Sequence, residues 1–438
     1  MTRPAPPVVD LARIASEVVG PRFKAYPRGA EPRPLMSIGE AGWNVLRGDL
    51  PFPIAVLKAS ALEHNAAWMR DYTRDAGVSL APHGKTTMCP QLFARQLADG
   101  AWGITVANVH QLDVCVDIGI RRVIMANQLV SAGDVAHVIA LQRAHPDLAF
   151  HFLVDSLAQL ARIEAEAARH PMSRPLTALL ELGVPDGRTG VRRRDDALAL
   201  ARAIGRSPAV SLVGLECYEG LTITGDAQGD DAHVAGLMRR MRDIAAAIDA
   251  EGLFEATPIL LSAGGSAVFD VVARELHATL SRPVHTILRS GCYVTHDSGM
   301  YERMLANVRE RAGDAWKSRP GPRHALEVWS QVQSRPEPGL AILTMGKRDV
   351  SYDVEMPRPL AWFRSGKHGA PAPVPASWRI AKLNDQHAYL DLAPGDDLEV
   401  GDLIGCGISH PCTTFDKWSL LVEVDDAYDV VGGLRTFF

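Results

Sequence analysis

Between residues 53 and 288, short runs of β-branched and aliphatic residues alternate with longer segments of helical periodicity. This alternation is typical of a parallel sheet in which a crossover helix follows each strand. The runs are PIAVLKAS, VSLAP, GITVA, RVIMA, FHFLVD, LTALLEL, SLVGLE, PILLS and HTILR. The amphipathic stretches between them include 61–76, 131–145, 156–169, 195–206 and 233–250. We predict an α/β fold with a (β/α)8 barrel, in which the first or the last of these nine runs pairs elsewhere; a doubly wound sheet is the alternative.

The pattern of residue types along the chain changes after KSRPGPRHAL at 317–326. The segments ALEVWSQVQS, GLAILTMG, WRIAKLN, HAYLDL, LIGCGIS and SLLVEVDD are typical of strands, with turn residues between them and no helical pattern. We therefore predict an N-terminal extension over 1–45 that wraps around one of two domains, the barrel over 46–318, and a C-terminal all-β domain over 319–438. The Pro-rich insert 364–378 is predicted to be an exposed loop.

Charge and composition favour a small-molecule partner. The 438 residues carry 46 basic and 51 acidic side chains, and the net charge of −5 gives no electrostatic footprint for nucleic acid or an anionic membrane. The N-terminus lacks the apolar core of a signal peptide, and no stretch approaches the roughly 18 apolar residues of a spanning helix, so we expect a soluble, cytoplasmic protein. The six cysteines are spread too thinly for a disulfide framework, which predicts reduced thiols and leaves room for one as a metal ligand.

Lys85 is the strongest candidate for a catalytic residue. In APHGKTTMCP it follows the predicted strand VSLAP and precedes a helix, which places its amine at the catalytic rim of a barrel. A lysine in a mostly apolar mouth, with His83 nearby, suits imine chemistry, because burial or a neighbouring cation frees the amine to attack a carbonyl. Lys58 in VLKAS also ends a run, and a solvated loop lysine is the ordinary alternative, so position alone does not choose between them.

The segment SAGGSAVFD at 262–270 predicts a phosphate site. Gly264, Gly265 and Ser266 would offer bare amides and a hydroxyl at the start of a helix, after a late barrel strand. The segment lacks the Lys-Ser/Thr of a Walker A loop and the full G-x-G-x-x-G of a dinucleotide fold, so a plain turn with two glycines stays an alternative.

Three further side chains follow predicted strands. Arg188, in ELGVPDGRTGV, has a fork of donors that suits a cofactor ring or a substrate carboxylate. Tyr218 in YEG and Tyr293 in SGCYVTHD suit a ring wall and a phosphate-binding hydroxyl. The structural alternatives are a surface arginine in a Gly-rich turn and two partly buried core tyrosines.

GCGISHPCTTFDKW at 405–418 is the strongest local signal for a metal. His410 and Cys412, two residues apart, can project to one side of an extended segment and offer nitrogen and sulfur to a zinc-like ion. Two protein ligands leave positions open for water or substrate, which is the catalytic arrangement. A chance pair is the alternative, and Cys406 is expected to be a small buried residue rather than a third ligand.

The order of these motifs resembles a known family. PHGKT, ANQLV (126–130), the Gly-x-Arg turn at 187–190, YEG, AGGS, GCYVTHD, NDQHAYL (384–390) and SHPC together are similar to the D-serine dehydratase and D-threonine aldolase family of fold-type III pyridoxal-phosphate enzymes. The similarity runs from about residue 50 to the C-terminus, and PHGKT and His-x-Cys are its specific elements. By resemblance, Lys85 rather than Lys58 carries the pyridoxal 5′-phosphate, with His83 beside it.

The resemblance also implies roles for the other candidates. It places phosphate on Gly264, Gly265, Ser266 and Tyr293, the ring beside Arg188 and Tyr218, and substrate at Gln128. A divalent metal is expected on His410 and Cys412, first Zn²⁺, with Mn²⁺ and Mg²⁺ as alternatives. Cysteine at the second metal position favours the dehydratases, since the aldolases more often carry aspartate there. The insert 364–378 and the long N-terminus depart from the compact family pattern, which puts substrate identity in doubt.

The implied function is a lyase that depends on pyridoxal phosphate and a metal. Acting on D-3-hydroxy amino acids, it would resemble D-serine dehydratase, forming a keto acid and ammonia. A retro-aldol cleavage of the D-threonine aldolase kind, an amino-acid racemase and a non-catalytic pyridoxal-phosphate carrier are the alternatives, with a sugar- or phosphate-handling barrel as a further class. A homodimer is expected by resemblance alone.

Overall fold

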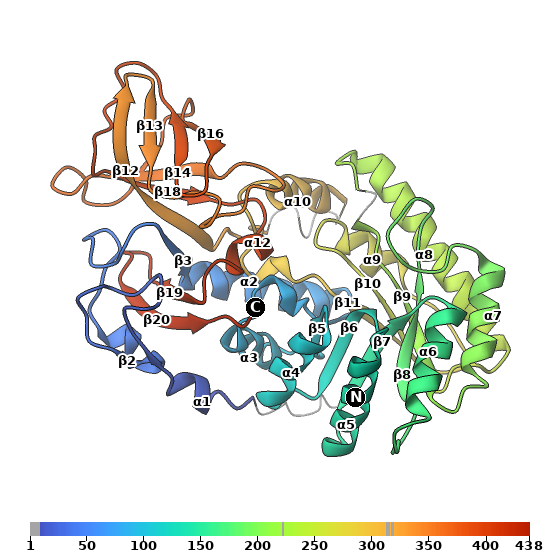
Figure 1. The fold of residues 1–438 in the computed structure, drawn as a ribbon. Coiled ribbons are helices and arrows are strands. Elements are labelled where there is room, and N and C mark those ends of the chain that lie inside the picture. The colour runs from blue at the N-terminus through green and yellow to red at the C-terminus, as the bar shows by residue number, and fades with distance from the viewer. Residues whose placement is uncertain (1–8, 221–222, 312–315, 317–318) are drawn as a thin grey trace.

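The computed structural model describes residues 9–220, 223–311, 316 and 319–438. Its first sheet has eight parallel strands in the order β4–β11–β10–β9–β8–β7–β6–β5 (Figure 1). Their bounds are β4 Ser79–Leu80, β5 Ile104–Val106, β6 Arg122–Gln128, β7 Ala149–Val154, β8 Leu176–Leu182, β9 Val210–Cys217, β10 Ile259–Ala263 and β11 Val284–Leu288. Successive strands are neighbours, as a barrel requires.

The two end strands of this sheet meet and close it. The Thr105 amide donates to the carbonyl of Pro82 at 2.9 Å, and the Trp102 amide donates to that of Leu80 at 2.7 Å. One layer of apolar side chains fills the interior of the closed barrel. These side chains lie in seven of the strands or directly after them: Ala81, Ile124, Leu153, Leu179, Val213, Leu260 and Ile287. The predicted (β/α)8 barrel is confirmed, and it is a packed core rather than a doubly wound sheet.

Helices alternate with the strands around the barrel (Figure 1). They are α2 Ala59–Asp75, α3 Pro90–Ala98, α4 Val109–Asp117, α5 Ala132–Ala144, α6 Leu157–Ala167, α7 Arg194–Ile204, α8 Ala227–Ala250 and α9 Phe269–Glu275. The five amphipathic stretches of the sequence match α2, α5, α6, α7 and α8. Asn108, Ser131, Ser156 and Asp226 cap the N-termini of α4, α5, α6 and α8 by accepting a backbone amide of the first turn. Among the described residues, no helix is both long and apolar enough to cross a membrane.

The C-terminal part is a β domain, as predicted. Its strands are β12 Leu326–Glu337, β13 Leu340–Leu343, β14 Arg358–Phe363, β15 Ala372–Pro373, β16 Arg379–Leu383, β17 Ala388–Asp391, β18 Leu403–Gly407, β19 Leu420–Val424 and β20 Val430–Arg435. The first of the nine runs, β3 (Ile54–Lys58), pairs antiparallel with β12 and parallel with β19. The surplus run is therefore the first one, and it belongs to the sheet of the β domain.

The N-terminal segment lies along the β19–β20 hairpin, where its blue ribbon meets the red one in Figure 1. It comprises α1 Ala12–Ala15, β1 Val18–Val19, β2 Arg33–Pro34 and the 3-10 turn η1 Leu35–Glu40. The side-chain amide of Asn44 donates to the Ala427 carbonyl at 3.0 Å and to the Asp429 carboxylate at 2.9 Å. This contact ties the N-terminal segment to the β19–β20 hairpin.

The insert 364–378 is mostly exposed, as expected, but it is not wholly irregular. Its strand β15 pairs antiparallel with β14. Trp378 is buried at its end, and the indole Nε1 donates to the Asp396 carboxylate at 2.7 Å. A buried tryptophan with a satisfied N–H anchors the insert to the β domain.

Candidate active site

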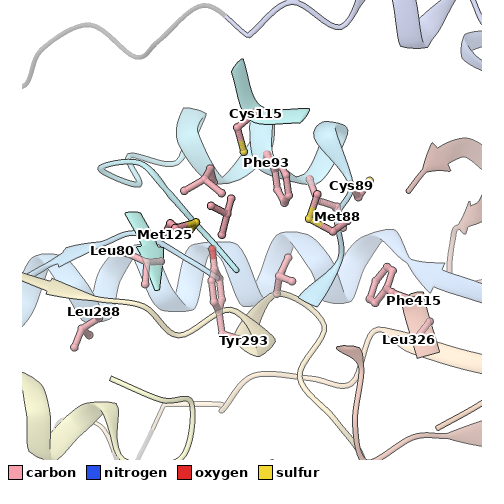
Figure 2. Packing of buried hydrophobic residues seen from close by; sticks show 14 of the residues in the cluster. Leu80, Met88, Cys89, Phe93, Cys115, Met125, Leu288, Tyr293, Leu326 and Phe415 are labelled. Carbon is pink, nitrogen blue, oxygen red and sulfur yellow. The ribbon is translucent and has the colours of Figure 1, made fainter. Parts of the chain in front are cut away.

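Lys85 lies at the carboxyl end of the barrel strands, where barrel enzymes carry their active sites. It occupies the 3-10 turn η2 (Gly84–Thr86), directly after β4, and its side chain is exposed while both neighbours in the turn are buried. Glycine at position 84 allows this turn to pack against α3, because a Cβ there would lie 2.8 Å from Cζ of Phe93. Figure 2 shows Phe93 within the cluster of buried hydrophobic residues.

Lys58 lies elsewhere. It ends β3, which belongs to the β-domain sheet, and its Nζ sits 5.3 Å from the ring centroid of Tyr428 in the same domain. Of the two lysines that the sequence left as rivals, Lys85 is the one at the barrel mouth.

His83 stands two residues before Lys85 in a cationic environment. Burial lowers the pKa of its imidazole well below the ordinary value, and the charges of Lys85, Arg289 and Arg188 lower it further. The buried Nδ1 has no hydrogen-bond partner among the described residues. A neutral imidazole next to Lys85 adds no positive charge to the mouth.

Arg289 is a buried cation that directly follows β11, at the carboxyl end of the barrel strands. It is 5% exposed and forms an ion pair with Glu216, which is 1% exposed. Its guanidinium also donates to the carbonyl of Cys217 at 3.1 Å and to the hydroxyl of Ser262 at 3.3 Å. Burial raises the pKa of the Glu216 carboxyl to about 7 in spite of this pairing.

Gln128, the predicted substrate residue, is held in a polar network. Its amide donates to the carboxylate of Glu181 and, at 3.2 Å, to that of Asp155. Thr189 donates its hydroxyl to Glu181 at 2.7 Å, and the Gly190 amide donates to Asp155 at 3.0 Å. The network ties the ends of β6, β7 and β8 to the loop that carries Arg188.

Sequence reasoning missed four charged members of this mouth. The signal was present, because each one lies at or next to the end of an apolar run at the catalytic edge. They are Asp155 after FHFLV, Glu181 in LTALLEL, Glu216 in SLVGLE and Arg289 in HTILR.

Arg188 and Tyr218 lie close together. The Arg188 guanidinium lies 5.3 Å from the ring centroid of Tyr218. Arg192 braces the loop by donating to the Gly187 carbonyl at 2.8 Å, and Arg240 of α8 donates to the Gly183 carbonyl at 2.7 Å. A loop held by two arginines presents Arg188 on a fixed base.

The Gly-rich loop after β10 binds an anion, but that anion is a side chain of this protein. The amides of Gly264 and Gly265 donate to the carboxylate of Glu219, at 3.2 Å for Gly264. Ser290 donates its hydroxyl to the carbonyls of both glycines at 3.3 and 3.2 Å. The sequence predicted that these amides are bare, but in the structure they are occupied by Glu219. Ser266 lines a small cavity next to them.

Tyr293 lies in the hydrophobic core next to the Gly-rich loop. Its ring is buried among hydrophobic residues in Figure 2, and it lines the same small cavity as Ser266. Burial raises the pKa of its hydroxyl, and nearby Gln96 of α3 opposes this shift.

His410 and Cys412 lie over the lysine turn. Cys412 opens the short helix α12 (Cys412–Phe415), and its Sγ is 3.4 Å from Oγ1 of Thr86, the residue after Lys85. His410 bonds through Nδ1 to the carboxylate of Asp353 at 2.6 Å. This contact leaves Nε2 for another partner.

The Cys412 thiol is activated. A hydrogen bond with Cys292 lowers its pKa to about 7, with further contributions from Thr86 and the charge of Lys85. The thiolate is the form of cysteine that binds metals and acts as a nucleophile.

Within the described ranges, no group of three His, Cys, Asp or Glu side chains is placed to hold a metal ion. Cys406 is fully buried in β18, in agreement with its expected role as a small core residue.

The barrel followed by a β domain is the alanine-racemase-like fold, and comparisons with known proteins place the chain within it. Residues 57–287 match the family model "Alanine racemase, N-terminal domain", and residues 325–424 match "Putative serine dehydratase domain". A D-threonine aldolase from Arthrobacter sp. is 26% identical over 377 residues, which are 85% of this chain and 89% of that protein.

Two solved structures share the fold. A D-threonine aldolase from Filomicrobium marinum has a TM-score of 0.71 at 24% identity, over 89% of this chain and 95% of its own. A D-threo-3-hydroxyaspartate dehydratase mutant in the metal-free form has a TM-score of 0.69 at 20% identity, over 90% and 99%. With more than half of the chain inside one family model, this protein belongs to the alanine-racemase-like family of fold-type III pyridoxal-phosphate enzymes, among the D-serine dehydratase and D-threonine aldolase-like lyases.

Proposed function

We propose that this enzyme is a lyase that depends on pyridoxal phosphate and a divalent metal and eliminates the 3-hydroxyl group of a D-3-hydroxy amino acid, as D-serine dehydratase does. One observation carries the proposal: Cys412, with His410 two residues before it, contacts the turn that holds Lys85. An amine for the cofactor and donors for a metal therefore share one mouth.

The mouth fits the cofactor. The Gly264 and Gly265 amides already converge on an anion, the Glu219 carboxylate, so the loop has the donor geometry that a phosphate needs. We assign the cofactor's covalent bond to Lys85 and its phosphate to this loop with Ser266, where the phosphate would replace the Glu219 carboxylate. Arg188 and Tyr218 would lie beside the ring, and His83 would stay neutral there.

The bound cofactor supplies an electron sink for bonds at the substrate's α-carbon. Lys85, exposed at the mouth, is the group placed to take the α-proton. Buried Arg289 and its partner Glu216 form a fixed ion pair at the carboxyl end of the barrel strands.

The donor set also fits a metal. A histidine whose Nδ1 is held by a carboxylate presents Nε2 to an ion, and Asp353 supplies that carboxylate. Nitrogen and sulfur donors favour Zn²⁺ over the oxygen-preferring Mn²⁺ and Mg²⁺. His410 and Cys412 would hold the metal, which would supply Lewis-acid chemistry for the leaving hydroxyl.

Aldol cleavage is the second candidate, and a specific observation favours it: the 26% identity to a D-threonine aldolase extends over 85% of the chain. The same residues would then serve to break the Cα–Cβ bond. Cysteine at position 412 is the feature that favours elimination.

The deciding experiment measures products from D-serine, D-threonine and D-threo-3-hydroxyaspartate, with and without a chelator. Elimination predicts keto acid and ammonia in equal amounts, lost on chelation. Aldehyde without ammonia would instead establish the aldolase reaction, and product formation indifferent to the chelator would remove the metal from the proposal.

A matched pair of lysine variants tests the cofactor assignment. Lys85→Ala is expected to lose the visible absorbance of bound cofactor and all turnover, whereas Lys58→Ala keeps both. Borohydride reduction of the native enzyme should leave the cofactor on the peptide that contains Lys85. A homodimer and a cytoplasmic location belong to this proposal as well, and sedimentation of the native protein tests the first.

A further inference from the structure

Two thiols from distant parts of the chain meet beside Lys85. Cys292 opens the 3-10 turn η4 (Cys292–Val294) after β11, and Cys412 opens α12 of the β domain. Their sulfur atoms are 3.8 Å apart, and Thr86 contacts both, at 3.7 Å from Cys292 and 3.4 Å from Cys412. We propose that this pair is a modification site, which a low-molecular-weight disulfide converts into an intramolecular Cys292–Cys412 disulfide.

The distance supports bond formation without rearrangement of the fold. A disulfide bond is about 2.05 Å long, so the two sulfur atoms must approach by roughly 1.8 Å, which rotation of the two side chains can supply. Each cysteine begins a short turn rather than lying within a strand, so neither side chain is locked in a sheet.

Exposure assigns the order of attack. Cys412 is partly exposed, whereas Cys292 is 6% exposed and lies behind it. The other four thiols, those of Cys89, Cys115, Cys217 and Cys406, are 0% exposed. A reagent that enters the mouth therefore meets Cys412 first, with Cys292 positioned to complete the exchange.

The chemistry balances in two exchanges. The Cys412 thiolate attacks one sulfur of the reagent, forms a mixed disulfide and expels one small thiol. The Cys292 sulfur then attacks Sγ of Cys412, forms the protein disulfide and expels the second small thiol. The protein loses two electrons and two protons, and the reagent gains both as two thiols.

The consequence for activity rests on the proposed function. A disulfide sulfur is no longer a thiolate, and the thiolate is the form that binds a metal. Oxidation would therefore remove one of the two proposed protein ligands, and reduction by dithiothreitol would restore it.

The test treats the native enzyme, and the enzyme stripped by a chelator, with oxidised glutathione, followed by non-reducing peptide mapping. We expect a Cys292–Cys412 cross-link without a retained glutathione adduct. Cys292→Ser should trap glutathione on Cys412, because the resolving thiol is gone. Cys115→Ala, which removes a buried thiol elsewhere, should form the cross-link as the native chain does.

Failure is distinguishable from failure of the proposed function. No cross-link in the stripped native enzyme, or a stable glutathione adduct on it, would overturn the dithiol proposal. If the cross-link forms but stoichiometric metal remains bound, the dithiol proposal stands and Cys412 is not a metal ligand. Metal content is read with a chromogenic chelator, so neither result depends on turnover.

Discussion

Replacing Arg289 with methionine should destabilise the barrel strongly and in a pH-dependent way. Arg289 and Glu216 are 5% and 1% exposed, and Oε2 of Glu216 has no hydrogen-bond partner among the described residues. Removing one partner of a buried ion pair costs about 3–5 kcal/mol, because the other charge stays buried without compensation. Part of that cost is the lost donation to Cys217 and Ser262, at about 1 kcal/mol for each bond.

The pH dependence follows from Glu216. Its folded-state pKa is raised to about 7 from 4.5, so the folded protein binds the proton first as pH falls through this window. In Arg289→Met above pH 7, the Glu216 carboxyl must either stay ionised without a partner or be protonated, and both cost free energy. Near pH 5 it is protonated with or without the arginine. We expect a loss of about 4 kcal/mol at pH 8 that shrinks to about 2 kcal/mol at pH 5, where only the lost hydrogen bonds remain.

Urea unfolding, followed by tryptophan fluorescence and circular dichroism at both pH values, measures this difference. The double variant Glu216→Gln with Arg289→Met should be more stable than Arg289→Met at pH 8, because no buried charge is left. Equal losses at pH 5 and pH 8, or a double variant weaker than the single one, would refute the reasoning.

Three further predictions use other contacts. Asp353→Ala should weaken metal affinity about 10- to 100-fold by freeing His410, as calorimetric titration would measure, and unchanged affinity would contradict this role. Burial lowers the folded-state pKa of His151 to about 4, so the unfolded chain binds a proton before the folded protein does as pH falls below 6.5. At 1.36 kcal/mol per pKa unit, acidification to pH 4 therefore costs about 3 kcal/mol of stability. His151→Gln should lose correspondingly less than the native protein between pH 7 and pH 4 in urea unfolding, and equal losses would argue against the assignment. Gly291→Ala should lower both stability and cofactor affinity, since its Cβ would meet the His83 carbonyl oxygen at 2.5 Å; native values in melting and cofactor titration would show that the contact yields.

The barrel could be predicted from the sequence because each of its strands is a short apolar run bounded by turn residues. It did not single out β20, since VVGGLR contains the glycine pair that usually marks a turn. In the structure those glycines serve packing: a Cβ on Gly433 would lie 2.5 Å from Cδ1 of Ile38, in the N-terminal segment that covers the hairpin. A contact nearly 400 positions distant in the chain leaves no local pattern.

Candidate residues at the mouth were predictable by position, because the ends of parallel strands gather at one rim. Their hydrogen-bond partners could not be predicted from the sequence. Glu219 accepts the loop amides that the sequence assigned to phosphate, and Gln96 of α3 lies near the Tyr293 hydroxyl. Both outcomes depend on which side chain of a neighbouring element reaches the donor first, which is a property of the packed molecule.

The placement of Cys412 over Lys85 follows from the one run that left the barrel. The chain enters the barrel from β3 and leaves it to β12, and these two strands pair, with Val56 opposite Glu327 and Leu57 opposite Leu326. Strand β19, which follows α12, lies parallel to β3 on the other side. Backbone hydrogen bonds on both flanks of β3 therefore fix it within the β-domain sheet, and β3 leads directly into α2 of the barrel. This chain connection and the contacts between α12 and η2 bring Cys412 next to the turn that holds Lys85, although the two residues are distant in sequence.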